Sequence, residues 1–305
     1  MEMEVELIRQ KKFGKTFSIA VIVAYFILLI YSGLNLISRA VSDMILSCIQ
    51  PVVFIVTAIV LFNEDAISFR DGLFIKKFKP KYLLIAVVAL LGLFFGFGHI
   101  NSVIGTGMEK AGLITLASIE MESFNDYVLY VIGTAGITAI GEEVLFRGVI
   151  LYGLCHYCVK QEGALDGRSQ LKISLIIGII FSAFHKNPAQ LIYQFACGTT
   201  FALITLKSGS IFPSIIIHFL NNFIILTFAY FAPNFNPLGW IQTGIGLAVF
   251  IGAFIVLLKD GVFSDDRGEV FTAKGFFSSA WVGIAFCFAI ILINIVTNVF
   301  TTYIL

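Results

Sequence analysis

The stretch from Tyr127 to Tyr152, YVLYVIGTAGITAIGEEVLFRGVILY, combines an apolar run long enough to cross a membrane with three charged residues near its centre. About 20 consecutive apolar residues span the hydrocarbon core of a bilayer as a helix. Ionisable side chains in such a helix are costly unless they pair with one another or face a wet cavity. The stretch therefore predicts a transmembrane helix that carries a polar site.

The whole chain has the composition of a membrane protein. Of its 305 residues, 58% are hydrophobic and 13% are charged, and its net charge is +1. Soluble domains carry about 25% charged residues, so a soluble enzyme of this length is excluded. Runs of about 20 apolar residues favour helices over a β-barrel. We expect an all-α, polytopic membrane protein with about eight or nine transmembrane helices. No basic cluster interleaved with aromatic residues indicates nucleic-acid binding.

Nine apolar segments are candidates for these helices, and the fifth is short with a polar end. They are Thr16–Ile37, Met44–Phe62, Tyr82–Val103, Tyr127–Tyr152, Ile173–His185, Ala189–Leu206, Ile211–Tyr230, Leu238–Leu258 and Phe276–Thr297. The predicted organisation is a group of N-terminal helices in residues 1–126, a core in 127–230 and C-terminal helices in 231–305. Residues 105–126 mix apolar and acidic side chains and predict an interfacial helix on the outer side.

The basic residues orient these segments. With the N-terminus in the cytoplasm, 16 of the 20 Lys and Arg residues lie on the inner side and three lie outside, namely Arg39, Lys110 and Lys186. This distribution follows the positive-inside rule and predicts a multi-pass protein with a cytoplasmic N-terminus. The excess of Lys over Arg, with abundant Ile and Phe, favours a bacterial cell membrane. The remaining basic residue, Arg147, lies within a span.

The three charges of the fourth span are Glu142, Glu143 and Arg147. On a helix, Glu143 and Arg147 are four residues apart and share a face, so we expect them to form an ion pair. Glu142 is rotated by about 100° from Glu143, and its charge is therefore less well neutralised. This makes Glu142 the candidate general base. The alternative is a buried structural triad that only fixes helix packing.

Two other spans contain polar residues of the kind used in catalysis. His185 ends the fifth span, and the seventh contains His218 and Asn222, four apart on one face. A carboxylate with a histidine can activate water, and a histidine with an asparagine can stabilise an oxyanion. Alternatively, one glutamate and two histidines, namely Glu142, His185 and His218, could hold a metal such as zinc with an open position for water. The residues alone leave both chemistries open.

The motifs of these spans resemble those of one family of membrane proteins. Glu142-Glu143-x-x-x-Arg147 resembles the EExxxR motif of the CPBP family, which includes type II CAAX prenyl endopeptidases and bacteriocin-processing or Abi-domain proteins. Phe181-x-x-x-His185 resembles its second motif, and the stretch from Gln194 to Asn222 resembles the third and fourth. The resemblance covers about residues 127–230, and motifs in this order are much more specific than any one of them.

The resemblance implies a helical intramembrane endopeptidase that hydrolyses a peptide bond of a membrane-associated protein or peptide. Carried over to this chain, Glu142 and His185 would activate water, while His218 and Asn222 would stabilise the tetrahedral intermediate. Glu143, Arg147 and Phe181 would support the site. No cofactor is required in this version, and zinc would serve in a metalloprotease version. The implied partners are membrane lipid and a substrate such as a prenylated CaaX-type protein, a leader peptide or a pheromone.

Two other functions are compatible with the same polar residues. One is a non-catalytic membrane scaffold or a bacteriocin-immunity factor of the same fold. The other is a transporter with an ion relay, which no inverted repeat supports.

The depth of His185 conflicts with a simple map of the spans. His185 lies about 20 Å along a helix from Lys172, nearer the outer side than Glu142 and His218. For the three side chains to meet, the fifth span must begin within the cytosol, be kinked or be re-entrant. Asn187 and Pro188 directly after it favour a broken helix.

Overall fold

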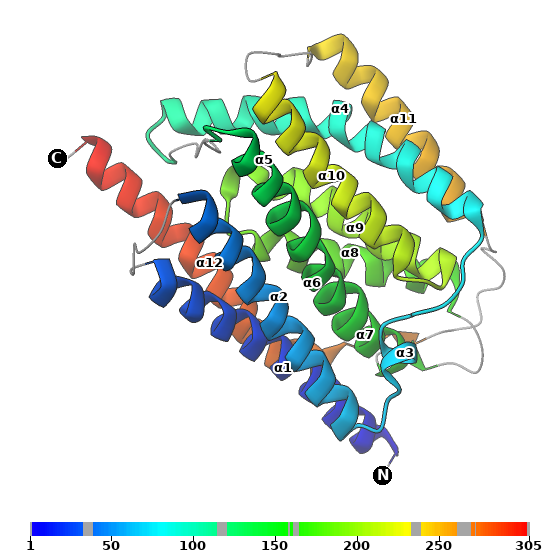
Figure 1. Cartoon of the computed structure of the whole chain (residues 1–305). Helices are drawn as coiled ribbons and strands as arrows, with labels where there is room; N and C mark the ends of the chain where they lie inside the picture. Colours follow the sequence, from blue (N-terminus) through cyan, green and yellow to red (C-terminus); the bar gives the residue numbers. More distant parts are fainter. Residues whose placement is uncertain are drawn as a thin grey trace.

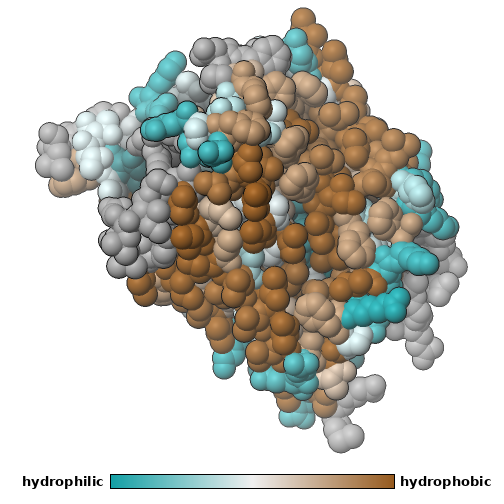
Figure 2. All heavy atoms as spheres, viewed as in Figure 1, coloured by the Kyte–Doolittle hydropathy of each residue, from teal (hydrophilic) through white to brown (hydrophobic). Residues whose placement is uncertain are grey.

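The computed structural model confirms an all-α membrane architecture (Figure 1). It describes residues 2–32, 39–114, 121–157, 159–160, 165–232, 239–260, 270–271 and 273–303. Within these residues, nine helices are long and apolar enough to cross a membrane. Exposed apolar side chains cover most of the molecular surface between its two ends (Figure 2), as a surface in contact with lipid requires.

Eight of the spans are formed by the long helices and one by a chain of short segments. The long helices are α1 (Glu2–Ser32), α2 (Arg39–Glu64), α4 (Pro80–Lys110), α8 (Gly167–Phe184), α9 (Leu191–Ser208), α10 (Phe212–Phe231), α11 (Trp240–Lys259) and α12 (Lys274–Tyr303). The fourth span is continuous through α5 (Phe124–Tyr130), η1 (Val131–Ile137), α6 (Thr138–Glu143), η2 (Val144–Ile150) and α7 (Leu151–Tyr157). The remaining elements are α3 (Phe69–Gly72), the short helix η3 (Pro188–Gln190) and an antiparallel pair of strands, β1 (Val159–Lys160) and β2 (Val270–Phe271).

Two details of the helices differ from the sequence prediction. The fifth span begins at Gly167 rather than Ile173, because the Asp166 side chain accepts a hydrogen bond from the Ser169 amide (2.6 Å) and caps the helix. The interfacial helix expected in residues 105–126 is not found in the described part of that range. Residues 105–110 complete α4, α5 begins at Phe124, and residues 115–120 lie outside the description.

The helices form three groups around a shared core (Figure 1). Helices α1, α2 and α12 lie on one side, α4 and α11 lie on the other, and the fourth span with α8, α9 and α10 lies between them. One hydrophobic cluster includes Phe13 of α1, Phe146 of η2 and Cys287 of α12. The three predicted parts of the chain therefore share one core, with residues 127–230 at its centre.

Segments that the charge pattern assigns to the same side of the membrane do lie at the same end of the bundle. Lys12 pairs with Asp65 (2.7 Å), and Lys81 pairs with Asp260 (2.7 Å). Strands β1 and β2 pair there as well. This grouping supports the predicted alternation of the spans. That this end faces the cytoplasm stays a prediction.

The hairpin of α8 and α9 is shorter than the helices that surround it. At its tip, the Lys186 ammonium lies over the ring of Tyr25, 4.9 Å from the ring centre. Tyr25 is seven residues before the end of α1, which is about 10 Å along that helix. The hairpin therefore turns before the level at which α1 ends, and that Lys186 belongs to the outer side stays a prediction.

The two helices of this hairpin approach each other closely at two glycines. A Cβ atom at Gly198 would lie 2.9 Å from the Cα atom of Gly178 and 2.8 Å from the Cβ atom of Phe181. Only glycine fits at these positions without displacing the partner helix. The close contact fixes the position of Phe181, and with it the last turn of α8.

Candidate active site

The helix that carries the two glutamates is interrupted by wider turns on both sides. Segments η1 and η2 are π-helical, and α6 lies between them with Glu142 and Glu143 in its last turn. Such turns are rare and occur frequently at functional sites. Both carboxylates point into the bundle, where Glu142 is 6% exposed and Glu143 is fully buried.

The predicted ion pair between Glu143 and Arg147 is present. Arg147 Nη1 lies 3.0 Å from Glu143 Oε1, and both side chains are fully buried. Arg147 Nη2 donates a hydrogen bond to the carbonyl of Gly198 (3.2 Å), and the guanidinium lies over the ring of Phe181, 4.6 Å from its centre. This arrangement connects the fourth span to both helices of the hairpin.

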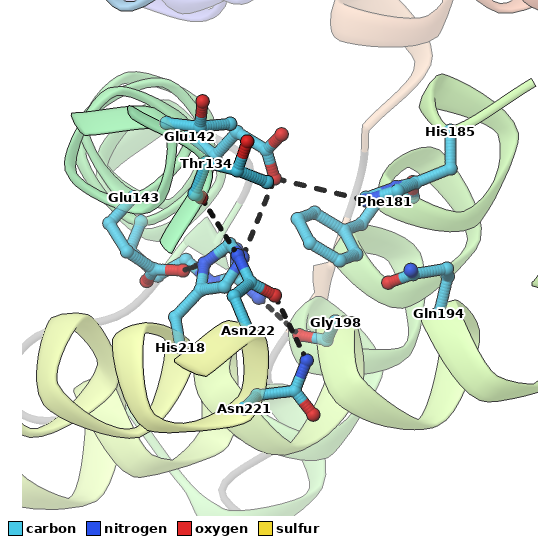
Figure 3. Close-up of polar contacts among 12 residues, drawn as sticks. Thr134, Glu142, Glu143, Phe181, His185, Gln194, Gly198, His218, Asn221 and Asn222 are labelled. Atoms are coloured by element: carbon cyan, nitrogen blue, oxygen red, sulfur yellow. Dashed lines mark hydrogen bonds and ion pairs between the residues drawn. The ribbon is translucent and has the colours of Figure 1, made fainter. Parts of the chain in front are cut away.

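Glu143 also holds His218, a contact that the sequence did not predict. Nδ1 of His218 lies 2.8 Å from Glu143 Oε1. Because a carboxylate paired with arginine accepts the hydrogen bond, Nδ1 is the donor. The other ring nitrogen, Nε2, then faces Glu142, with Nε2 at 3.7 Å from Oε2 (Figure 3).

His185 is oriented in the same way by the backbone of its own helix. Its Nδ1 donates a hydrogen bond to the carbonyl of Phe181 (2.8 Å), which leaves Nε2 facing Glu142 Oε2 at 3.9 Å. The structure thus brings Glu142, His185 and His218 together, and the conflict over the depth of His185 is resolved. Helix α8 starts earlier in the sequence than predicted, and it ends inside the bundle.

The three groups meet through atoms that all accept hydrogen bonds. When each histidine carries its proton on Nδ1, both Nε2 atoms present lone pairs, and an ionised Glu142 presents only acceptor atoms. Glu142 Oε2 is buried and has no hydrogen-bond partner among the described residues. Such a convergence of acceptors requires a proton donor or a cation between them. A water molecule, which can donate two hydrogen bonds, meets this need.

Asn222 lies beside this cluster and is held by residues that the sequence analysis did not select. Its Nδ2 donates to the carbonyl of Thr134 (3.2 Å), and its Oδ1 accepts from Asn221 Nδ2 (3.1 Å). Asn221 Oδ1 in turn accepts a 2.5 Å hydrogen bond from the hydroxyl of Tyr193. The stretch that resembles the third and fourth motifs begins at Gln194, whereas Tyr193, one residue before it, is the group that reaches Asn221.

The site opens toward the tip of the hairpin. The side chain of His185 is 19% exposed, in contrast to 5% for His218. Gln190 and Gln194 follow on the next turns, are half-buried and share a hydrogen bond (3.5 Å). Figure 3 shows Gln194 beside Phe181 and His185, on the far side of the cluster from Glu143. Of the two histidines beside Glu142, His185 is therefore the more accessible, and polar side chains follow it.

Glu142, His185 and His218 are the side chains that could bind a metal ion at this site. One carboxylate and two imidazoles are ligands that zinc accepts, and at metal–ligand distances of about 2.0–2.1 Å neighbouring tetrahedral ligand atoms lie about 3.3 Å apart. The distances from Glu142 Oε2 to the two Nε2 atoms are 3.7 and 3.9 Å. In the part of the chain that the structure describes, no three His, Cys, Asp or Glu side chains are spaced to hold a metal ion. The residues fit zinc in kind, but not in the positions they occupy.

Residues 124–224 match the sequence model of a family described as Rce1-like, type II CAAX prenyl endopeptidase. The matched segment contains Glu142, His185, His218 and Asn222 and extends from the start of α5 into α10. This match is consistent with the CPBP family and confirms the resemblance predicted from the motifs. Comparisons with curated proteins and with solved structures gave no match.

Proposed function

We propose that this protein, whose central segment is Rce1-like, is an intramembrane endopeptidase in which Glu142 activates water. The observation that carries the proposal is the convergence of Glu142 Oε2 with the Nε2 atoms of His185 and His218, at 3.9 and 3.7 Å. General bases and their partners need this proximity to a shared water molecule. A structural triad would not require Glu142, since Glu143 already neutralises Arg147.

In the proposed reaction, the water lies between Glu142 and His185. Glu142 removes a proton from the water as its oxygen attacks the carbonyl carbon of the scissile peptide bond. The carbonyl oxygen becomes an oxyanion, stabilised by the Asn222 amide and by His218. His218 donates through Nε2 when both ring nitrogens carry protons, while its Nδ1–H continues to donate a hydrogen bond to Glu143. Protonated Glu142 then gives its proton to the leaving amine as the peptide bond breaks.

The surroundings of the site suit a substrate that is held at the membrane. The cluster lies between helices whose outer surfaces are apolar, and its exposed edge is polar. A peptide anchored to lipid, such as a prenylated CaaX-type protein, a leader peptide or a pheromone, reaches this edge from within the bilayer. We place the basic end of the bundle in the cytoplasm of a bacterial cell, in line with the positive-inside rule.

Cleavage by the purified protein tests the proposal. Reconstituted in liposomes with a lipid-anchored peptide, the protein is expected to produce two fragments that mass spectrometry identifies. A chelator of zinc is expected to leave the rate within about twofold of the untreated enzyme, because Glu142 activates water without a metal. A rate that falls with the chelator and returns with added zinc would instead assign Glu142, His185 and His218 as metal ligands. If no fragment forms under any of these conditions, the result would favour a non-catalytic scaffold.

Tyr193 is expected to act as a positioning residue through Asn221. Tyr193→Phe removes the hydroxyl that fixes the Asn221 amide, and with it the orientation of Asn222. Because oxyanion stabilisation depends on such orientation, kcat should fall about tenfold with KM little changed. Thr227→Val is the matched control, since it removes a hydroxyl that bonds the carbonyl of Phe223 (2.7 Å) on the same helix as Asn222. Equal effects of the two substitutions would show that Tyr193 only stabilises the fold.

A further inference from the structure

Lys186 is a cation at the tip of the α8–α9 hairpin, directly after His185. Its ammonium lies 4.9 Å from the ring centre of Tyr25 and 5.1 Å from that of Phe184. The side chain is half-buried between the hairpin and α1, next to the polar edge of the site. Lysine is thus held at a depth where an ammonium group is costly without a counter-charge.

Among the residues that the structure describes, none forms an ion pair with this ammonium. Among the described residues, no carboxylate lies within 4.0 Å of Lys186, and its contacts are the two aromatic rings. Glu142 interacts with Lys186 electrostatically from beyond ion-pair distance, and its carboxylate is directed toward the two histidines. Aromatic faces offset part of the cost of a desolvated cation but leave its hydrogen-bonding capacity unused.

The backbone at this position is also unusual. Lys186 has φ of 52°, in the left-handed region that a residue with a side chain rarely adopts. The hydrogen bond from its amide to the carbonyl of Ala183 (3.1 Å) and the turn of Asn187 into η3 hold it there. Strained residues of this kind cluster at ligand-binding sites. The turn thereby places a long cationic side chain one residue after His185, over the rings of Tyr25 and Phe184.

We infer that Lys186 binds a carboxylate of the peptide substrate, an inference that rests on the proposed endopeptidase function. An unmodified peptide carries negative charge only on its C-terminal carboxylate and on Asp or Glu side chains. Either group, on the His185 side of the scissile bond, would supply the hydrogen-bonded counter-charge that the described residues do not provide. Lys186 would then select substrates and set the distance between their carboxylate and the bond that is cleaved.

Matched peptides test this inference in the reconstituted protein. One peptide has a free C-terminal carboxylate, a second has a C-terminal carboxamide, and a third has its acidic side chains replaced by amides. For the native protein, loss of the recognised carboxylate should raise KM about tenfold or more with little change in kcat. Whichever peptide shows the effect identifies the source of the carboxylate.

Substitutions at Lys186, combined with the same three peptides, show whether the residue and the substrate carboxylate act together. Lys186→Met should cleave all three peptides with the same raised KM, whereas Lys186→Arg should keep the preference, since it retains the charge. Lys172→Met, an exposed lysine near the other end of α8, is the control and should behave as the native protein does. Each variant is compared by thermal unfolding, so that a folding defect is seen separately.

Three results would overturn the inference. In the first, Lys186→Met still discriminates between the peptides. In the second, the native protein treats all three alike. In the third, the effect of Lys186→Met appears only in vesicles that contain anionic lipid, which would make a lipid phosphate the partner. If the proposed function fails, no peptide is cleaved by any variant. If only this inference fails, the carboxamide peptide is still cleaved by every active variant, so the two failures are distinguishable.

Discussion

Glu142→Gln is expected to lower kcat for peptide hydrolysis by about a thousandfold, with the protein still folded in the membrane. An amide of nearly the same shape cannot accept the proton of the attacking water, and general-base catalysis contributes about 10²- to 10⁴-fold. The substitution leaves the buried ion pair of Glu143 with Arg147 intact. Because Glu142 Oε2 has no hydrogen-bond partner among the described residues, little structure depends on its charge.

The measurement is single-turnover cleavage of the anchored peptide in liposomes, together with the thermal unfolding midpoint. Glu122→Gln is the matched control, because Glu122 is exposed at the start of the fourth span, away from the site. Activity within a few-fold of the native protein in Glu142→Gln would contradict the mechanism. It would show that the cluster of Glu142 with the two histidines serves packing or binding.

Arg147→Met is expected to have the largest effect on stability, a loss of about 3–5 kcal/mol in the free energy of unfolding. The arginine and its partner Glu143 are both fully buried, so removal of the arginine leaves a buried carboxylate that has lost its cationic partner and is still held by His218. The hydrogen bond to the carbonyl of Gly198 is lost as well. Helix η2 would then lose its main polar link to the hairpin.

A double substitution separates charge from packing. Glu143→Gln combined with Arg147→Met removes both charges and leaves an amide that can still accept from His218. It should therefore destabilise the protein less than Arg147→Met alone. Arg168→Met, an exposed arginine at the start of α8, is the control and should change the unfolding midpoint little. A double variant that is less stable than the single one would show that packing of the guanidinium between Phe181 and Phe201 matters more than its charge.

The sequence predicted the spans and the pairing of charges because both follow from strong energy terms. Apolar runs must be about as long as the bilayer is thick, and buried charges must pair. The spacing of Glu143 and Arg147 therefore predicts the ion pair that they form. The separation of Glu142 from that pair follows from the same helix geometry, although η2 is π-helical where an α-helix was assumed.

Two features could not be predicted in this way. One is the depth at which the α8–α9 hairpin turns, and the other is the set of hydrogen bonds that hold Asn222 in place. Length and polarity do not show whether a short helix crosses the bilayer or ends within it, so they did not predict that Lys186 contacts Tyr25 before the end of α1. Tyr193 and Asn221 act through hydrogen bonds between α9 and α10, which depend on how helices pack against each other. Such contacts are set by crossing angles and side-chain shape, which no spacing along one helix records.

The short α8–α9 hairpin also bears on how the chain enters the membrane. Of the nine candidate spans in the described part of the chain, these two helices are the least apolar and the most buried. A segment that leaves the translocon partitions into lipid according to its apolar surface, so this hairpin gains least from lipid alone. By the time it is synthesised, the first four spans have already been made, and their surfaces can receive it. His185, which this hairpin contributes to the cluster, is thus delivered into a partly assembled protein that already contains Glu142.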